Sequence, residues 1–117
     1  MAVQPSVGYD SCPNAAIEAL GAGLTLVASD AVDLTSRFDE DGVIFRFRAG
    51  DAEDLASALS KALCEPRALW EARGARARAA IAERFSEERL VSRVEALLEG
   101  KTSFRAGAGL ASGGGER

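Results

Sequence analysis

The sequence predicts an α/β fold, with a short parallel sheet, flanking helices and a helical C-terminus. Three observations support this prediction. Residues 13–28 indicate a helix, a Gly-rich turn and a buried strand, residues 43–47 indicate a second strand, and residues 51–99 contain three helical stretches. A helix, a tight turn and a buried strand in this order form half of an α/β unit with parallel strands.

The first predicted helix begins near Pro13, because proline lacks an N–H that would have no partner in the first turn anyway. Ser11 is the expected N-cap, since a serine hydroxyl can accept from the first amides of a helix. The residues that follow favour a helix, namely Ala15, Ala16, Ala19 and Leu20. We expect Gly21 and Gly23 to end this helix.

Three segments have the character of strands or of the loops beside them. The apolar run Leu24–Ala28 is short enough for a strand, and we expect it to be buried on both faces. Val43–Phe47 alternates along the chain as a strand does. Met1–Ser6 indicates the tail of a strand that enters a loop. The polar residues 29–42 predict a loop with one helical turn.

Two helices are expected between residues 51 and 84. Asp51 is the expected N-cap of the first, and Pro66 ends it. Its apolar face contains Leu55, Leu59, Ala62 and Leu63. The second spans Arg67–Arg84, with Gly74 as a weak point. Its expected packing contacts are Leu69, Trp70, Ala77, Ala80 and Ile81.

The end of the chain divides into a helix and a tail. Ser86 is the expected cap of a third helix that continues to residue 99. Its apolar stripe consists of Leu90, Val94, Leu97 and Leu98. Residues 101–117 are rich in glycine and poor in apolar side chains, which predicts disorder. We therefore expect one domain at residues 1–100 and a disordered tail at 101–117.

Composition excludes several classes of function. The net charge is −4, from 14 basic and 18 acidic residues, and this argues against a general nucleic-acid binder. The basic residues Arg73, Arg76, Arg78 and Arg84 are interpreted as a solvated helix face. The chain has no histidine, so catalytic triads and His-containing zinc sites are absent, and no metal site is expected.

The two cysteines indicate in which cellular compartment the protein is expected. Cys12 and Cys64 are far apart in sequence and lack the spacing of a metal site. We interpret them as reduced thiols of a cytoplasmic protein, and a disulfide is the less favoured alternative. No apolar run reaches the length of about 18 residues that a membrane helix needs.

The start of the first helix suggests a ligand site. Its amides lack partners inside the helix and lie at the positive end of the helix dipole, so those of Ser11, Cys12 and Asn14 suit a phosphate. The carboxylates of Asp10 and Glu18 accept hydrogen bonds and suit hydroxyl groups. The alternative from spacing alone is an ordinary loop residue at Asp10 and an exposed helix charge at Glu18.

The run PSVGYDSCPNAAIEALGAGLTLVASD resembles the donor-binding segment of the retaining GT-B glycosyltransferases, specifically glycosyltransferase family 4 (the group 1 glycosyltransferases). Pro5 and Ser6 match the opening of the family motif. Asp10 stands where the first Glu of the motif is found, and Glu18 matches the second. The residues that follow the second Glu in place are Ala19, Gly23, Val27 and Ala28.

The resemblance continues more weakly through Asp41-Gly42, Gly50-Asp51 and Phe85-Ser86, and it covers roughly residues 3–99. The chain departs from the family at two positions. Asp10 is one methylene shorter than the usual Glu, and Thr25 replaces the usual Pro.

This resemblance implies a Rossmann-like GT-B domain that binds a nucleotide-diphosphate sugar. Glu18 would hold the ribose hydroxyls. Asp10, as the catalytic carboxylate, and the loop residues Ser11, Cys12 and Asn14 would face the donor sugar and the diphosphate. The family generally needs no metal and no further cofactor. The whole enzyme would transfer a hexose to an acceptor with retention at the anomeric carbon.

The number of strands predicts a fragment. Two good strands and one truncated strand are fewer than the usual 4–6 of an open sheet. We therefore expect the C-terminal part of a GT-B domain, inactive alone and lacking its N-terminal acceptor domain. An exposed edge at the first strand would invite self-association, and a peripheral membrane contact of the full-length enzyme stays open. The alternative is a non-catalytic Rossmann-like remnant that acts as a protein-interaction module.

Overall fold

The computed structural model describes residues 1–38 and 42–101. It separates into two compact units, Met1–Phe85 and Ser86–Arg117. The described part of the first unit contains β1 (Ala2–Gln4), α1 (Asn14–Gly21), β2 (Leu26–Ser29), α2 (Asp33–Arg37), β3 (Ile44–Phe47), α3 (Ala52–Cys64) and α4 (Arg67–Arg84). The second unit contains α5 (Glu87–Leu98). The predicted tail beyond Lys101, and Asp41 of the family resemblance, lie outside the described residues.

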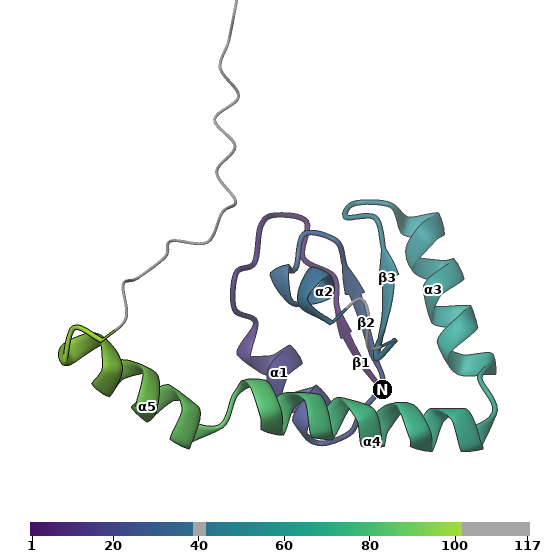
Figure 1. The fold of residues 1–117 in the computed structure, drawn as a ribbon. Helices are drawn as coiled ribbons and strands as arrows, with labels where there is room; N and C mark the ends of the chain where they lie inside the picture. Colours follow the sequence, from purple (N-terminus) through teal and green to yellow (C-terminus); the bar gives the residue numbers. More distant parts are fainter. Residues whose placement is uncertain (39–41, 102–117) are drawn as a thin grey trace, which may run out of the picture. The chain divides into compact units, whose positions relative to one another are not determined.

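The three strands form one parallel sheet in the order β1-β2-β3 (Figure 1). In its register Val3 lies beside Val27, and Val27 beside Phe45. All four residues of β2 are buried, as expected for a central strand. The predicted α/β fold with a short parallel sheet is therefore confirmed. The truncated strand expected near the N-terminus is β1, and the helical turn expected in residues 29–42 is α2.

Two apolar clusters cover the two faces of the sheet. On one face, Leu26 and Ala28 of β2 join a cluster with residues of α1, α2 and α4. On the other face, Val27 and Phe47 pack with Ala58 and Ala62 of α3. Figure 1 shows α3 on the opposite side of the strands from α1 and α2. The alternation of side chains along β2 thus assigns successive residues to different clusters.

The start of α1 differs from the prediction. Pro13 occupies the N-cap position and the helix begins at Asn14, so the expectation that Ser11 caps it is wrong. Pro13 is buried, with an extended backbone, and its carbonyl accepts from the amides of Ala16 and Ile17. Because the side chain of proline has no hydrogen-bond acceptor, it does not cap the helix.

The turn after α1 packs directly on α4. Gly23 has a φ of +76°, a conformation that glycine adopts at little cost. A Cβ atom added to Gly74 would lie 2.4 Å from the carbonyl oxygen of Gly23. The low helix propensity of Gly74 is therefore offset by a tertiary role, because its missing side chain lets the two backbones meet.

Arg73 is a packed residue, not part of a solvated face. Its guanidinium pairs with the carboxylate of Glu65, donates to the carbonyl of Gly42 and lies 4.3 Å from the ring centroid of Phe45. The Arg73 side chain is only 15% exposed. The prediction of a solvated basic patch is thus wrong for Arg73, and the residue instead joins α4 to β3 and to the α3–α4 turn.

Several large apolar side chains are more exposed than the sequence predicted. Leu63 is 71% exposed, and the side chains of Leu69 and Trp70 are also exposed. The predicted packing of Leu55, Leu59 and Ala62 is confirmed, and the buried Ala58, which was not predicted, also packs in the cluster between α3 and the sheet. The predicted N-cap at Asp51 is confirmed, since its Oδ1 accepts from the amide of Asp54 at 2.9 Å.

Helix α5 forms the described part of the second unit. Ser86 caps it as predicted, with its Oγ accepting from the amide of Arg89 at 3.2 Å. The helix buries none of its residues, and its exposed apolar residues are Leu90, Val91, Val94, Leu97 and Leu98. Among the described residues, no helix combines the length and the apolar character needed to cross a membrane.

Candidate functional site

Asp10 lies at the carboxyl end of the parallel strands, where the loop after β1 meets the loop after β2. Its amide donates to the carbonyl of Ala31 at 3.0 Å, and its own carbonyl accepts from the amide of Asp33 at 2.9 Å. These two bonds form a parallel bridge with Val32. The backbone of Asp10 is thereby tied to the end of the central strand. In open α/β sheets, ligands bind at this end of the strands.

The side chain of Asp10 is also held, and only through one of its oxygens. Oδ2 lies 3.2 Å from Nε2 of Gln4 and 3.2 Å from Oγ of Ser6. The Gln4 amide also donates to Oγ of Ser6 at 3.2 Å. Within the part of the chain that the structure describes, Oδ1 of Asp10 has no hydrogen-bond partner. The half-buried carboxylate therefore keeps one oxygen available to a ligand.

Ser29 supports this network from the central strand. It is completely buried, and its Oγ donates to the carbonyl of Ser6 at 2.6 Å. Sequence reasoning did not single out Gln4 or Ser29, and it used Ser6 only as part of a motif. A signal was available, since Gln4 and Ser29 are polar residues at the carboxyl ends of strands that are otherwise apolar.

The start of α1 offers free amides. Among the described residues, the amides of Asn14 and Ala15 have no partner, because no side chain caps the helix. Ser11, Cys12 and Asn14 are exposed, and Sγ of Cys12 lies 4.0 Å from Oδ1 of Asn14. The predicted phosphate contacts are thus accessible, and the amide of Ala15, which the sequence analysis omitted, joins them.

Glu18 stands apart from the Asp10 network. It is exposed on α1, and no hydrogen bond or ion pair joins its side chain to another described residue. In the described part of the chain, no hydrogen bond or ion pair joins Glu18 to Asp10. Of the five predicted site residues, only Asp10 is held by side chains from other elements.

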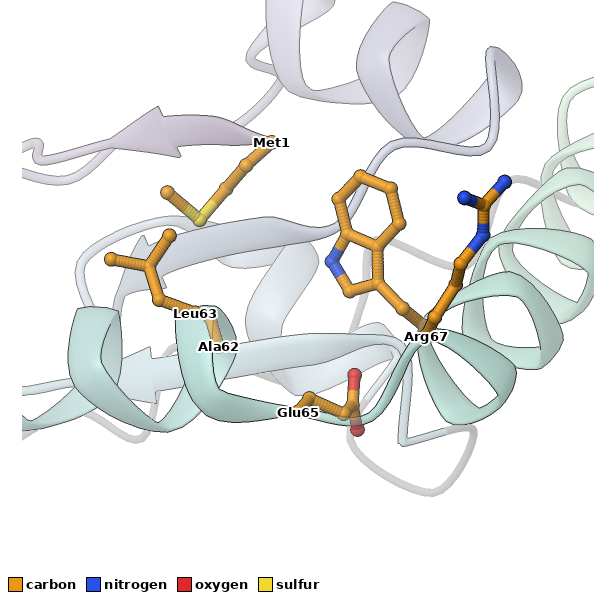
Figure 2. Close-up of a pocket in the computed structure, with 6 residues that line it drawn as sticks. Met1, Ala62, Leu63, Glu65 and Arg67 are labelled. Carbon is orange, nitrogen blue, oxygen red and sulfur yellow. The ribbon is translucent and has the colours of Figure 1, made fainter.

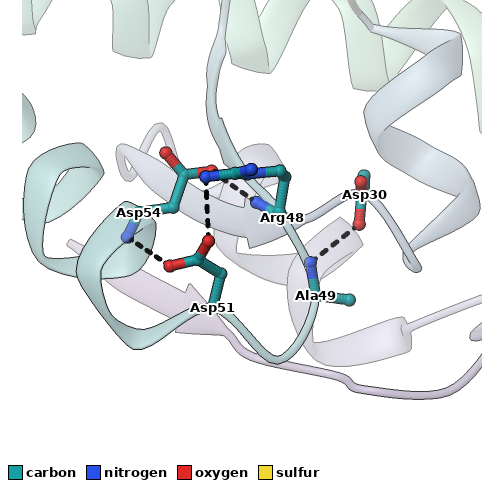
Figure 3. Close-up of polar contacts among 5 residues, drawn as sticks. All are labelled: Asp30, Arg48, Ala49, Asp51 and Asp54. Atoms are coloured by element: carbon teal, nitrogen blue, oxygen red, sulfur yellow. Dashed lines mark hydrogen bonds and ion pairs between the residues drawn. The ribbon is translucent and has the colours of Figure 1, made fainter.

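A second polar cluster lies at the carboxyl end of β3 (Figure 3). Arg48 pairs with Asp51 at 2.8 Å, and its amide donates to Oδ2 of Asp54 at 2.7 Å. This amide is the main reason that the pKa of Asp54 lies below its ordinary value. Oδ1 of Asp30 accepts from the amide of Ala49 at 2.9 Å. The carboxylates of this cluster thus cap α3 and hold a turn.

No metal arrangement appears among these acidic groups. In residues 1–38 and 42–101, no group of three or more His, Cys, Asp or Glu side chains is arranged to hold a metal ion. Cys12 and Cys64 are both free and exposed.

The structure has an apolar pocket at the amino end of β1 (Figure 2), with a volume of about 260 Å³. Its lining consists of Met1, Ala62, Leu63, Glu65, Arg67 and Trp70. Figure 2 shows Met1 and Leu63 extending toward each other. Glu65 forms part of the lining, and its ion pair with Arg73 lowers its pKa from the ordinary value. None of the predicted site residues lines this pocket.

Comparison with known proteins identifies no relative of this chain. No protein-family model, no curated protein and no solved structure matches the chain.

Proposed function

We propose that the carboxyl end of β1 and the start of α1 bind a nucleotide-diphosphate sugar, and that the chain is the donor-binding part of a retaining GT-B glycosyltransferase. The observation that carries this proposal is the fixed carboxylate of Asp10, whose Oδ1 has no partner among the described residues. An ionised carboxylate accepts hydrogen bonds only. Asp10 is therefore suited to hydroxyl groups, which a sugar provides.

The start of α1 complements this carboxylate. The unpartnered amides of Asn14 and Ala15 suit the negative oxygens of a diphosphate, which the helix dipole also favours. Glu18 is exposed and accessible to ribose hydroxyls. The described residues of this site include no basic side chain. The proposal therefore assigns the neutralisation of the diphosphate to residues of a longer enzyme, which would also provide the acceptor domain.

The proposed enzyme works by orientation and charge stabilisation. The bond between the anomeric carbon and the diphosphate breaks, and its electron pair leaves with the diphosphate. The carbon bonds to the oxygen of an acceptor hydroxyl with retention, and the proton of that hydroxyl passes to the leaving diphosphate. Asp10 would orient the donor sugar, and the helix amides would stabilise the charge that develops on the leaving group. A cytoplasmic location belongs to the same proposal, since nucleotide sugars and reduced cysteines fit that compartment.

Amide NMR of the full chain tests the proposal. The chain is titrated with UDP, GDP and their sugars. We expect shifts confined to residues 8–18, and we expect Glu18→Ala to weaken binding of every nucleotide about tenfold or more. The matched control is Glu87→Ala, an exposed helix glutamate in the second unit. Well-dispersed spectra without shifts for any ligand would overturn the proposal.

The second candidate function is a protein-interaction module. The five exposed apolar residues of α5 and the pocket beside Met1 favour it, because contiguous exposed apolar surface often marks an interface. Self-association through β1, which among the described residues pairs only with β2, stays a prediction of this kind. Under this alternative, Leu97→Glu abolishes association through the apolar residues of α5, measured by light scattering, and Glu18→Ala leaves it unchanged.

A further inference from the structure

We infer that Gln4 and Ser6 are positioning residues that orient the Asp10 carboxylate, so that Oδ1 is the atom that receives a hydroxyl of the donor sugar. This inference rests on the proposed function and adds to it two residues and a direction. Both neighbours bond the same oxygen of Asp10, Oδ2.

Each oxygen of the Asp10 carboxylate can accept a limited number of hydrogen bonds. A carboxylate oxygen has two lone pairs, so the N–H of Gln4 and the O–H of Ser6 fill the capacity of Oδ2. The side-chain amide of Gln4 has two N–H hydrogens, so it can donate to Asp10 and to Ser6 at the same time. Oδ1 then holds the remaining acceptor sites of the carboxylate.

The Asp10 carboxylate is held by contacts from more than one direction. The carboxylate could rotate about its side-chain bonds if only one group held it. Here Gln4 approaches from β1 and Ser6 from the loop, while the backbone of Asp10 is bridged to Val32. The buried hydroxyl of Ser29 fixes the carbonyl of Ser6 and so keeps Ser6 in place. The direction of Oδ1 is thereby set before a ligand arrives, which reduces the entropy lost on binding.

The chemistry of Oδ1 determines which part of the donor it can bind. An acceptor-only oxygen repels phosphate oxygens and attracts O–H groups. Gln4 and Ser6 therefore affect the sugar part of the donor and not its diphosphate. The inference thus predicts a change in the preference between a nucleotide sugar and the free nucleotide, an effect that a general loss of stability would not produce.

The experiment uses the full chain with Ser6→Ala and Gln4→Met, singly and together. Ser60→Ala is the matched control, because this exposed hydroxyl bonds only the carbonyl of Ala56 in its own helix. The first readout needs no ligand. The three-bond Hα–Hβ couplings of Asp10 should indicate one χ1 rotamer in the wild type and averaging over rotamers in the double variant. Couplings that stay unchanged in the double variant would overturn the inference.

The second readout is the affinity ratio between UDP-glucose and UDP, and between GDP-mannose and GDP. We expect this ratio to fall about tenfold in the double variant, while the affinity for UDP or GDP alone changes less than about twofold. An unchanged ratio would overturn the inference and leave the donor site intact. If the wild type binds no nucleotide, the proposed function fails, and the couplings of Asp10 alone decide whether Gln4 and Ser6 position it.

Discussion

The two ends of the sheet are held by different kinds of interaction. At the carboxyl end, side chains bond the backbone of neighbouring loops, as Ser29 does with the carbonyl of Ser6 and Asp30 with the amide of Ala49. At the amino end, elements meet by close packing around one poorly exposed ion pair. The backbone of Gly74 lies against that of Gly23, and the guanidinium of Arg73 lies against Phe45 and pairs with Glu65.

This difference predicts different sensitivities. A packed contact fails when volume is added, because protein interiors have few voids. A hydrogen-bonded loop fails when a donor or acceptor is removed, because the partner left behind stays buried without a bond. The polar end also has groups that a ligand can use, such as Oδ1 of Asp10. Four substitutions test this contrast, in order of decreasing effect on the free energy of unfolding, and one of them also predicts a pH dependence.

Gly74→Ala tests the packed end most directly. We expect a loss of about 3 kcal/mol, since the new Cβ would lie 2.4 Å from the carbonyl oxygen of Gly23 and backbone must move. This outweighs the gain of about 1 kcal/mol that alanine has over glycine inside a helix. Denaturant unfolding measures the change. Gly21→Ala is the control, because its Cβ would meet Ile81 at an ordinary 3.5 Å. A Gly74→Ala protein as stable as the wild type would contradict the close contact.

Glu65→Gln tests the ion pair at the same end. The Glu65 and Arg73 side chains are 10% and 15% exposed, so removing one charge leaves the other poorly solvated. We expect a loss of about 2 kcal/mol at pH 7. In the control Glu71→Gln, the pair with Arg67 is solvent-exposed and should contribute less than about 0.5 kcal/mol. Equal effects of the two substitutions would argue against a buried pair.

The same variant predicts a pH dependence. Arg73 lowers the pKa of Glu65 below its ordinary value of 4.5 in the folded protein. A lowered folded pKa gives a contribution to stability that is complete above the unfolded pKa and is lost as the pH falls through the folded pKa. The stability difference between wild type and Glu65→Gln should therefore shrink below about pH 4.5. A difference that is constant from pH 7 to pH 3 would contradict this assignment.

Ser29→Ala tests the hydrogen-bonded end. It removes the hydroxyl that bonds the carbonyl of Ser6 at 2.6 Å, and the volume change is small. We expect a loss of about 1.5 kcal/mol, because a buried acceptor loses its partner. Thermal and denaturant unfolding measure it. Ser60→Ala, at an exposed helix position, should be neutral or slightly stabilising. If both substitutions behave alike, the Ser29 bond contributes nothing to stability.

Thr25→Val has the smallest expected effect and the opposite sign. Thr25 is 1% exposed at the amino end, and its hydroxyl has no hydrogen-bond partner among the described residues. Replacing this hydroxyl by a methyl group should stabilise the protein by about 1 kcal/mol. The matched control is Thr35→Val, because the equally buried Thr35 donates to the carbonyl of Val32 at 2.7 Å and should lose stability. Destabilisation by both substitutions would imply a partner for Thr25.

Local chemistry explains which parts of the fold were predictable. The caps at Asp51 and Ser86, the turn at Gly23 and the buried strand β2 depend on neighbours within a few residues, so composition and spacing indicate them. The cap at Ser11 failed because the burial of Pro13, a tertiary effect, fixed the start of α1. The prediction that Leu63 belongs to the packed face of α3 failed, and the buried Ala58 was not predicted, because periodicity does not show how closely a helix approaches its sheet.

The candidate site likewise has residues that the sequence indicates and residues that only the tertiary structure reveals. The resemblance of the sequence to a family motif indicated Asp10 and the loop before α1, and the free amides of a helix start made an anion site chemically reasonable there. Only the tertiary structure brought Gln4, Ser6 and Ser29 around that carboxylate, and only it placed Gly74 against Gly23. The physical reason is that the sequence determines helices and strands through short-range sterics and hydrogen bonds. The partners of a side chain depend on which strands pair and which helices cover them, and that is decided when the whole core packs.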